Sequence, residues 1–254
     1  MESQRTGRFN LEVNTSAILY RLGTTLIDTG PPNRWPQVRN FLQERSPEQV
    51  LLTHHHEDHS GNGARIQAEF GAQILAHPAA LPELAAGWRL RPYQRVFWGQ
   101  APKLIAQTVP EVNELHGGLR LQTICTPGHA DDLVCYLEPE RGWLFTGDLY
   151  VGNRPRYLRQ DESLSLQIES LHTILSHGFK VVFCGHRGVV TEGYRALQEK
   201  LDYPLNFCEQ VKTLNGKGIP AREITRRLLG REDLTSLATL GHFTKGNMVR
   251  GCLA

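Results

Sequence analysis

Several features that define whole classes of protein are missing from this sequence of 254 residues. No stretch approaches the roughly 18 apolar residues that a membrane-spanning helix needs. The first ten residues hold no apolar run that could act as a secretory signal. The net charge of +2 is too small to indicate a nucleic-acid partner by itself. We therefore expect no membrane partner and a cytoplasmic location.

Cysteine is scarce and scattered. An odd number of widely spaced cysteines without a C-x-x-C pair is typical of reduced thiols rather than of a disulfide framework. We therefore expect five free thiols, with Cys125 and Cys184 buried in apolar strands. The complete set is Cys125, Cys135, Cys184, Cys208 and Cys252.

Apolar residues recur with strand or helix spacing through the first 190 residues. The spacing predicts antiparallel strands within 9–28 and further strands at 49–53, 72–76, 119–126, 133–137, 143–146 and 180–184. It predicts helices from Pro36 onward, at 60–70 and at 163–177. Residues 78–116 are rich in proline and predict an irregular excursion with short helices, either a lid over a site or a cap on the sheet.

Beyond residue 191 the pattern predicts only helices, including one at 219–230. We therefore divide the chain into a catalytic domain, 1–190, and a C-terminal helical appendage, 191–254. The two halves of the first domain resemble each other: each has an acidic turn, at Asp28 or Asp148, and an apolar strand that ends in a histidine, His54 or His186. Two such halves face to face predict an α/β fold, a four-layer αββα sandwich with its polar residues along one edge.

The densest group of polar side chains is the segment 53–61, T-H-H-H-E-D-H-S-G. It contains H-x-H-x-D-H, formed by His54, His56, Asp58 and His59. A loop after a strand can turn these groups inward from several directions, and imidazole with carboxylate suits zinc, iron and manganese. For this segment alone, a polar loop that happens to be rich in histidine remains the alternative.

Three later strands end in the same manner, with a glycine and then a ligand-type side chain. His129 follows C-T-P-G, Asp148 follows L-F-T-G, and His186 follows F-C-G. Glycine allows the backbone to turn sharply and to approach a metal closely. The repetition of this arrangement predicts a metal centre and argues against a chance cluster of histidines.

These motifs, in this order, resemble the metallo-β-lactamase superfamily over about residues 10–190. The resemblance implies that Asp28 supports the metal-binding loop by accepting a hydrogen bond. It also implies two zinc ions, with iron or manganese as alternatives. Their ligands would be His54, His56 and His129 for the first ion, Asp58, His59 and His186 for the second, and Asp148 as the bridge between them.

Such a centre lowers the pKa of a shared water and supplies a hydroxide nucleophile, which Asp58 and Asp148 would orient as catalytic residues. The favoured substrate is a small-molecule ester, thioester or lactone, as in the glyoxalase II and lactonase branches. True β-lactamases of this fold carry Cys or Ser where this chain has Asp148, which argues against antibiotic hydrolysis.

Two other activities stay open. Phosphodiester or RNA cleavage could use the basic residues of the C-terminal segment, although acidic residues interspersed among them are typical of a solvated face. A mononuclear-iron sulfur dioxygenase would use only His56, His129 and Asp148 as ligands. The aromatic segment 88–98 and the segment 150–160, with Tyr150 and several arginines, are expected to border the pocket. His55 is expected to point away from it, and His242 is expected to be structural or exposed to solvent.

Overall fold

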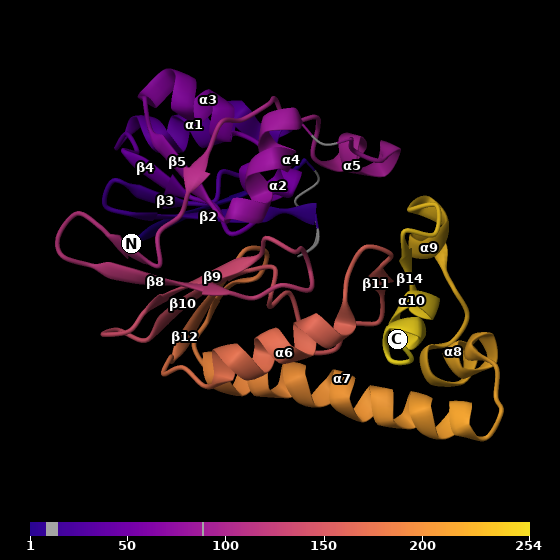
Figure 1. Cartoon of the computed structure of the whole chain (residues 1–254). Coiled ribbons are helices and arrows are strands. Elements are labelled where there is room, and N and C mark those ends of the chain that lie inside the picture. Colours follow the sequence, from indigo (N-terminus) through magenta and orange to yellow (C-terminus); the bar gives the residue numbers. More distant parts are fainter. Residues whose placement is uncertain (9–14, 88) are drawn as a thin grey trace.

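The computed structural model describes residues 1–8, 15–87 and 89–254. The strand pattern predicted for residues 9–14 and the aromatic residue Trp88 lie outside the described residues. Two six-stranded sheets face each other, and helices cover the outer face of each sheet (Figure 1). The predicted four-layer αββα architecture is therefore confirmed.

The first sheet has the strand order β1-β2-β3-β4-β5-β6. Its first three strands are antiparallel, and β3 to β6 are parallel, which requires the crossover helices that cover its outer face. The strands are β1 (Glu2–Thr6), β2 (Ala17–Leu22), β3 (Thr25–Ile27), β4 (Gln49–Leu51), β5 (Gln73–Ala76) and β6 (Gln107–Thr108). The helices are α1 (Trp35–Gln43), α2 (Glu57–Ser60), α3 (Gly63–Phe70) and α4 (Leu81–Ala86), with 3-10 turns at Pro32–Arg34 and Pro78–Ala80.

The second sheet has the order β13-β12-β10-β9-β8-β7. Two helices cover its outer face, α6 (Leu164–Leu175) and the long α7 (Gly193–Gly216). Only β10 and β12 are parallel, and α6 forms the crossover between them. The strands are β7 (Val112–Glu114), β8 (Arg120–Cys125), β9 (Val134–Glu138), β10 (Trp143–Gly147), β12 (Val181–Cys184) and β13 (Gly188–Val190).

Three apolar clusters fill the spaces between the four layers. The cluster between the sheets joins Tyr20 and Ile27 of the first sheet to Tyr136, Phe145 and Phe183 of the second. A second cluster packs α1, α3 and α4 on the first sheet, and a third packs α6 and α7 on the second. Burial of this apolar area stabilises the sandwich and holds the strand ends in register.

Strand β1 was not predicted, because its residues E-S-Q-R-T show no apolar alternation. Backbone pairing with β2 forms this strand, in the register Glu2↔Arg21 to Thr6↔Ala17. The buried Arg21 guanidinium pairs with Glu2 and donates to the Phe41 carbonyl at 2.8 Å. An edge strand of this kind depends on main-chain bonds and polar contacts, which apolar periodicity does not report.

The segment 78–116 has the short helices that were predicted, α4 and α5 (Pro92–Phe97). It also contains two short strands that were not predicted. β6 is the last strand of the first sheet, and β7 is the last strand of the second. This segment therefore carries the chain from one sheet to the other.

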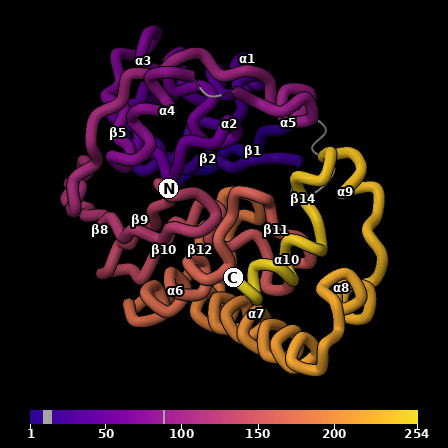
Figure 2. The backbone as a smooth tube through the Cα atoms, turned by 45° about the vertical axis from the view of Figure 1, so that its right-hand side comes forward, coloured from indigo at the N-terminus to yellow at the C-terminus, as the bar shows by residue number. Residues whose placement is uncertain are grey.

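The C-terminal segment is mainly helical, with α7, α8 (Ala221–Leu229), α9 (Leu234–Ala238) and α10 (Lys245–Gly251). The expectation of helices alone was wrong at one place, since β14 (Phe243–Thr244) pairs with β11 (Leu158–Arg159). This pairing brings the C-terminal segment against the catalytic layers, and Figure 2 shows β14, α9 and α10 beside β11 and α5. Within the described ranges, no helix combines the length and the apolar character that crossing a bilayer requires.

Two expectations for cysteine were also wrong. Cys208 and Cys252 form a disulfide between α7 and the residue after α10, with their Cα atoms 4.9 Å apart. The packing of two helices that are distant in sequence creates this proximity, so spacing along the chain could not indicate it. Cys125, at the end of β8, is exposed, whereas Cys135 and Cys184 are buried free thiols.

Candidate metal centre

The side chains predicted as metal ligands gather at one edge of the sandwich, where strands of both sheets end. His54 follows β4, and Asp58 and His59 lie on the short helix α2. Because β10 and β12 are hydrogen-bonded parallel neighbours, the residues that follow them, Asp148 and His186, emerge side by side.

Asp148 is the centre of this cluster. Its Oδ1 lies 3.2 Å from Nε2 of His59 and 3.1 Å from Nε2 of His186. Its Oδ2 lies 3.3 Å from Nε2 of His129. One carboxylate thus reaches histidines from both of the predicted ligand groups.

The remaining predicted ligands complete two adjoining groups. Ligand atoms of His54, His56 and His129 lie within 4.8 Å of one another, and those of Asp58, His59 and His186 do the same. In the first group, Nδ1 of His56 is 3.0 Å from Nε2 of His129. All seven side chains that the sequence predicted are therefore brought together.

Three of the inward atoms are buried without a hydrogen bond in the described part of the chain: Nε2 of His54, Nε2 of His59 and Oδ1 of Asp148. A buried polar atom without a partner costs free energy unless something else satisfies it. Imidazole nitrogen and carboxylate oxygen are ligands for zinc, iron and manganese. The donor set therefore fits metal ions in both type and placement.

The pKa values divide the histidines into two kinds. Burial lowers the pKa of His54 and of His56 well below the ordinary value, so both imidazoles are neutral and can offer a lone pair. Burial also opposes the protonation of His59, but the carboxylates of Asp148 and Asp28 outweigh it and raise the pKa of His59 well above the ordinary value. A cation that binds Nε2 of His59 must therefore displace a proton.

The outer nitrogens of three ligand histidines are each held by a neighbouring oxygen. Nδ1 of His59 bonds Oδ2 of Asp28 at 2.7 Å, as the family resemblance implied for Asp28. Nδ1 of His129 lies 2.8 Å from Oε1 of Glu162, and Nδ1 of His186 lies 2.6 Å from the carbonyl oxygen of Ser16. These contacts orient each ring so that Nε2 faces inward.

Asp28 is itself held in place. Its carboxylate accepts hydrogen bonds from the backbone N–H of Thr53 at 2.8 Å and from the Thr53 hydroxyl. Its backbone adopts φ +60°, a left-handed conformation that is uncommon outside glycine. The motif loop is thus tied to the end of β3 through one buried carboxylate.

Sequence reasoning missed a chain of hydrogen bonds that reaches the centre from the C-terminal segment. Nη2 of Arg159 lies 3.0 Å from Nε2 of His56, and the same guanidinium pairs with Asp161 at 2.8 Å. Asp161 bonds Nε2 of His242 at 3.1 Å, and Nδ1 of His242 bonds the Tyr93 hydroxyl of α5 at 2.6 Å. Only the general expectation that 150–160 borders the pocket pointed to Arg159.

Three further predictions concerned residues near the metal ligands, and two of them are confirmed. His55 points away from the ligand groups and bonds Asp132 at 2.8 Å, as predicted. His242 is buried and structural, also as predicted. Tyr150 packs in the apolar core with Leu197 and Leu201, so its side chain does not stand among the ligands.

Comparison with known proteins decides the family. The model of the metallo-beta-lactamase superfamily matches residues 10–186. The chain belongs to the metallo-β-lactamase superfamily. Within this superfamily, the chain is 28% identical over 206 residues to an atrochrysone carboxyl ACP thioesterase of Aspergillus novofumigatus, covering 78% of this chain and 55% of that protein. The chain thus spans about half the length of that relative.

Two further superfamily members are informative. A hydroxyacylglutathione hydrolase of Idiomarina loihiensis is 27% identical over 214 residues, which cover 82% of this chain and 70% of that protein. The solved structure of TTHA1623 in a di-iron-bound form is 27% identical, with a TM-score of 0.58, and covers 76% of this chain and 96% of that one. The name of the first relative is that of a thioesterase, and the name of the second is that of a hydroxyacylglutathione hydrolase.

Proposed function

We propose that this chain is a metal-dependent hydrolase that cleaves a small-molecule thioester, ester or lactone at a dinuclear centre, with zinc as the expected metal and iron or manganese as alternatives. The observation that carries this proposal is the position of Asp148, whose carboxylate lies within 3.1–3.3 Å of His59, His129 and His186. A side chain in that position fits a bridge between two cations.

His54, His56 and His129 would hold one ion, and Asp58, His59 and His186 the other, with Asp148 shared between them. When bound, two such ions supply a hydroxide nucleophile at neutral pH and stabilise the negative charge that develops during acyl transfer. Asp58 and Asp148 accept hydrogen bonds and so orient the attacking water. Asp28 and Glu162 keep His59 and His129 aligned through their Nδ1 atoms.

The relatives favour a thioester over the other substrates. Both the fungal relative and the bacterial relative are named for the hydrolysis of acyl thioesters. The di-iron form of TTHA1623 supports two metal ions and leaves iron open as the metal. The complete second group, Asp58, His59 and His186, favours a dinuclear centre over the three-ligand iron site of a sulfur dioxygenase.

Three of the C-terminal basic residues that RNA cleavage would use are already paired with carboxylates. Arg226 and Arg227 both pair with Glu223 at 2.9 Å, and Lys245 pairs with Asp233 at 2.8 Å. Positive charges that are already paired with carboxylates are poorly suited to follow a phosphate backbone. We therefore retain RNA cleavage as an outcome of the test and not as a second proposal.

The test compares zinc-loaded protein with chelator-treated protein on an acyl-thioester and lactone panel and on a single-stranded RNA oligomer. Metal content is measured on the same samples. Metal-dependent release of thiol or acid, with about two metal ions per chain and intact RNA, is the expected result. Metal-dependent RNA cleavage with inert thioesters would contradict the proposal. Oxygen uptake with a persulfide, seen only in iron-loaded protein, would contradict it as well.

A further inference from the structure

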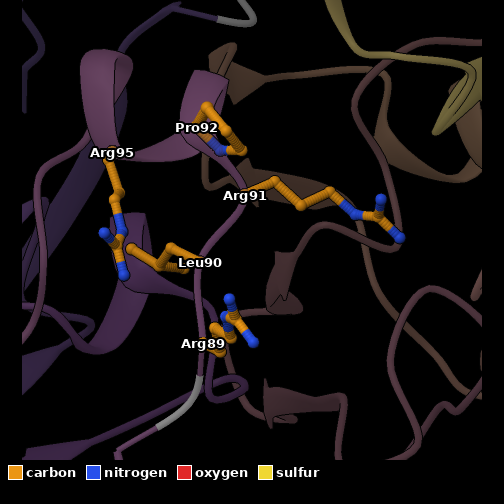
Figure 3. A pocket seen from close by; sticks show the side chains of 5 residues that line it. All are labelled: Arg89, Leu90, Arg91, Pro92 and Arg95. Atoms are coloured by element: carbon orange, nitrogen blue, oxygen red, sulfur yellow. The ribbon is translucent and has the colours of Figure 1, made fainter.

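Three arginines line a cavity of about 600 Å³ on the segment that joins α4 to α5. Leu90 and Pro92 complete its lining. Figure 3 shows Arg89 and Arg95 on opposite sides of Leu90, while Arg91 extends away from Arg95. The three guanidinium groups are therefore spread around the hollow and do not converge on a single point.

These three charges are not neutralised by the protein. Arg89, Arg91 and Arg95 are exposed, and no carboxylate of residues 1–8, 15–87 and 89–254 forms an ion pair with any of them. Arg159, which is buried, differs from these three arginines because it pairs with Asp161 and with Glu162. Exposed guanidinium groups without a carboxylate partner, placed around a hollow, are suited to an anionic ligand.

The same segment reaches the candidate metal centre from two sides. The Tyr93 hydroxyl bonds His242, which continues through Asp161 and Arg159 to His56. At the other end of α5, the ring of Trp98 lies 6.5 Å from that of His186. The cavity is therefore lined by a segment that also borders the metal ligands.

We propose that Arg89, Arg91 and Arg95 bind the phosphate groups of a phosphopantetheine-type thiol carrier, the leaving half of a thioester substrate. This inference rests on the proposed thioester hydrolysis. Guanidinium groups bind phosphate oxygens through paired N–H donors. Three separated guanidiniums match several phosphate groups better than the carboxylates of a small peptide thiol.

The reaction balances with water as the only co-reactant. The water oxygen forms a bond to the acyl carbon, and the carbon–sulfur bond breaks. One proton of the water stays with the acid, and the other leaves with the thiol. The phosphates of the carrier take no part in these bond changes, so the arginines act on binding rather than on the chemical step.

The first measurement is binding, independent of turnover. Desulfo-coenzyme A, which lacks the thiol that could bind a metal, is titrated calorimetrically into the metal-loaded protein. The triple variant R89Q/R91Q/R95Q should bind it about tenfold or more weakly, because charge-assisted hydrogen bonds are lost. Wild-type affinity should also fall as salt is added.

The control has the same change in net charge at exposed arginines elsewhere in the chain, R45Q/R222Q/R231Q. It should bind desulfo-coenzyme A as the wild type does. Equal weakening in the control would mean that net charge alone, and not the cavity, governs binding, and would overturn the proposal. A triple Arg→Lys variant at 89, 91 and 95 should recover part of the affinity.

The second measurement compares kcat/KM for acetyl-coenzyme A, S-acetyl-4′-phosphopantetheine and S-acetylpantetheine. The ratio of kcat/KM for acetyl-coenzyme A to that for S-acetylpantetheine should fall about tenfold or more in the R89Q/R91Q/R95Q variant, because KM for acetyl-coenzyme A rises. A preference for acetyl-coenzyme A over the phosphopantetheine thioester identifies the nucleotide carrier. Equal kcat/KM for acetyl-coenzyme A and S-acetyl-4′-phosphopantetheine, together with a higher kcat/KM for an acylated carrier protein, identifies the substrate as phosphopantetheine attached to a carrier protein.

The two proposals fail in different ways. Thioester hydrolysis with the same binding and the same ratio in wild type and triple variant would overturn the arginine subsite and leave the proposed function standing. Arginine-dependent binding of desulfo-coenzyme A, with no thioester hydrolysed by the wild type, would overturn the proposed function and leave an anion-binding subsite.

Discussion

Oε1 of Glu162 lies 2.8 Å from Nδ1 of His129 and so determines which way that imidazole faces. The Glu162 side chain is 9% exposed. Burial raises its pKa, but the hydrogen bond from His129 and the charges of His129 and Arg159 outweigh burial and lower it. It stands just before α6, far from any histidine motif in the sequence. A carboxylate in this position fixes the tautomer and raises the basicity of a metal-binding histidine.

Replacing this carboxylate should therefore weaken metal binding. We expect Glu162→Gln to reduce metal affinity by about 10- to 100-fold, measured by competition with a chromogenic chelator. The fold should be retained, because glutamine has nearly the same shape. Glu140→Gln, at an exposed turn after β9, is the control and should bind metal as the wild type does. Equal affinity in the Glu162→Gln and Glu140→Gln proteins would show that Glu162 does not support the site.

Removal of Asp148 should affect both metal positions together. Its carboxylate contacts histidines of both groups, so we expect Asp148→Ala to lose metal as well as activity. Metal content after dialysis, measured by mass spectrometry, checks this. An Asp148→Ala protein that keeps two tightly bound metal ions would refute the bridge.

The raised pKa of His59 makes the stability of metal-free protein depend on pH. His59 binds its proton more tightly in the folded chain than in the unfolded chain. The proton on His59 therefore stabilises the folded state fully below about pH 6.5. This stabilisation is lost as the pH rises through the raised pKa of His59. We expect the Tm of chelator-treated protein to fall over that range.

The Tm of zinc-loaded protein should not show this fall with pH, since the metal takes the place of the proton on Nε2 of His59. In metal-free His59→Gln protein, the fall of Tm with rising pH should also be smaller. The His172→Gln variant, at an exposed position, should show the same fall as the wild type. If the Tm of metal-free His59→Gln protein falls with pH as steeply as that of the wild type, His59 is not the cause of the pH dependence.

The disulfide between Cys208 and Cys252 should stabilise the C-terminal segment. It closes a loop with a sequence separation of 44 residues, for which about 2–4 kcal/mol is typical. We expect a reductant to lower the Tm of the wild type but to leave C208S/C252S unchanged. Titration of denatured, unreduced protein should find three thiols, matching Cys125, Cys135 and Cys184. Five reactive thiols would contradict the pairing.

Much of the site could be predicted because each ligand follows a buried strand within a short local motif. His54 and His186 each terminate an apolar strand, and the parallel or antiparallel order of such strands places their ends at one edge. Glu162 and Arg159 have no such local signal. They reach His129 and His56 only because the loop before α6 passes the segment that follows β8, where the backbone N–H of Ser163 donates to the Gly128 carbonyl at 2.8 Å.

Apolar periodicity and the H-x-H-x-D-H spacing are local properties of the chain, so the layer pattern, the family and the seven side chains of the candidate metal centre could be predicted from them. Three features were visible only in the folded chain: the polar edge strand β1, the Cys208–Cys252 pair and the link from Tyr93 through His242 to the metal ligands. These features join segments that are distant in sequence. Such contacts arise only when burial of the apolar clusters brings those segments together.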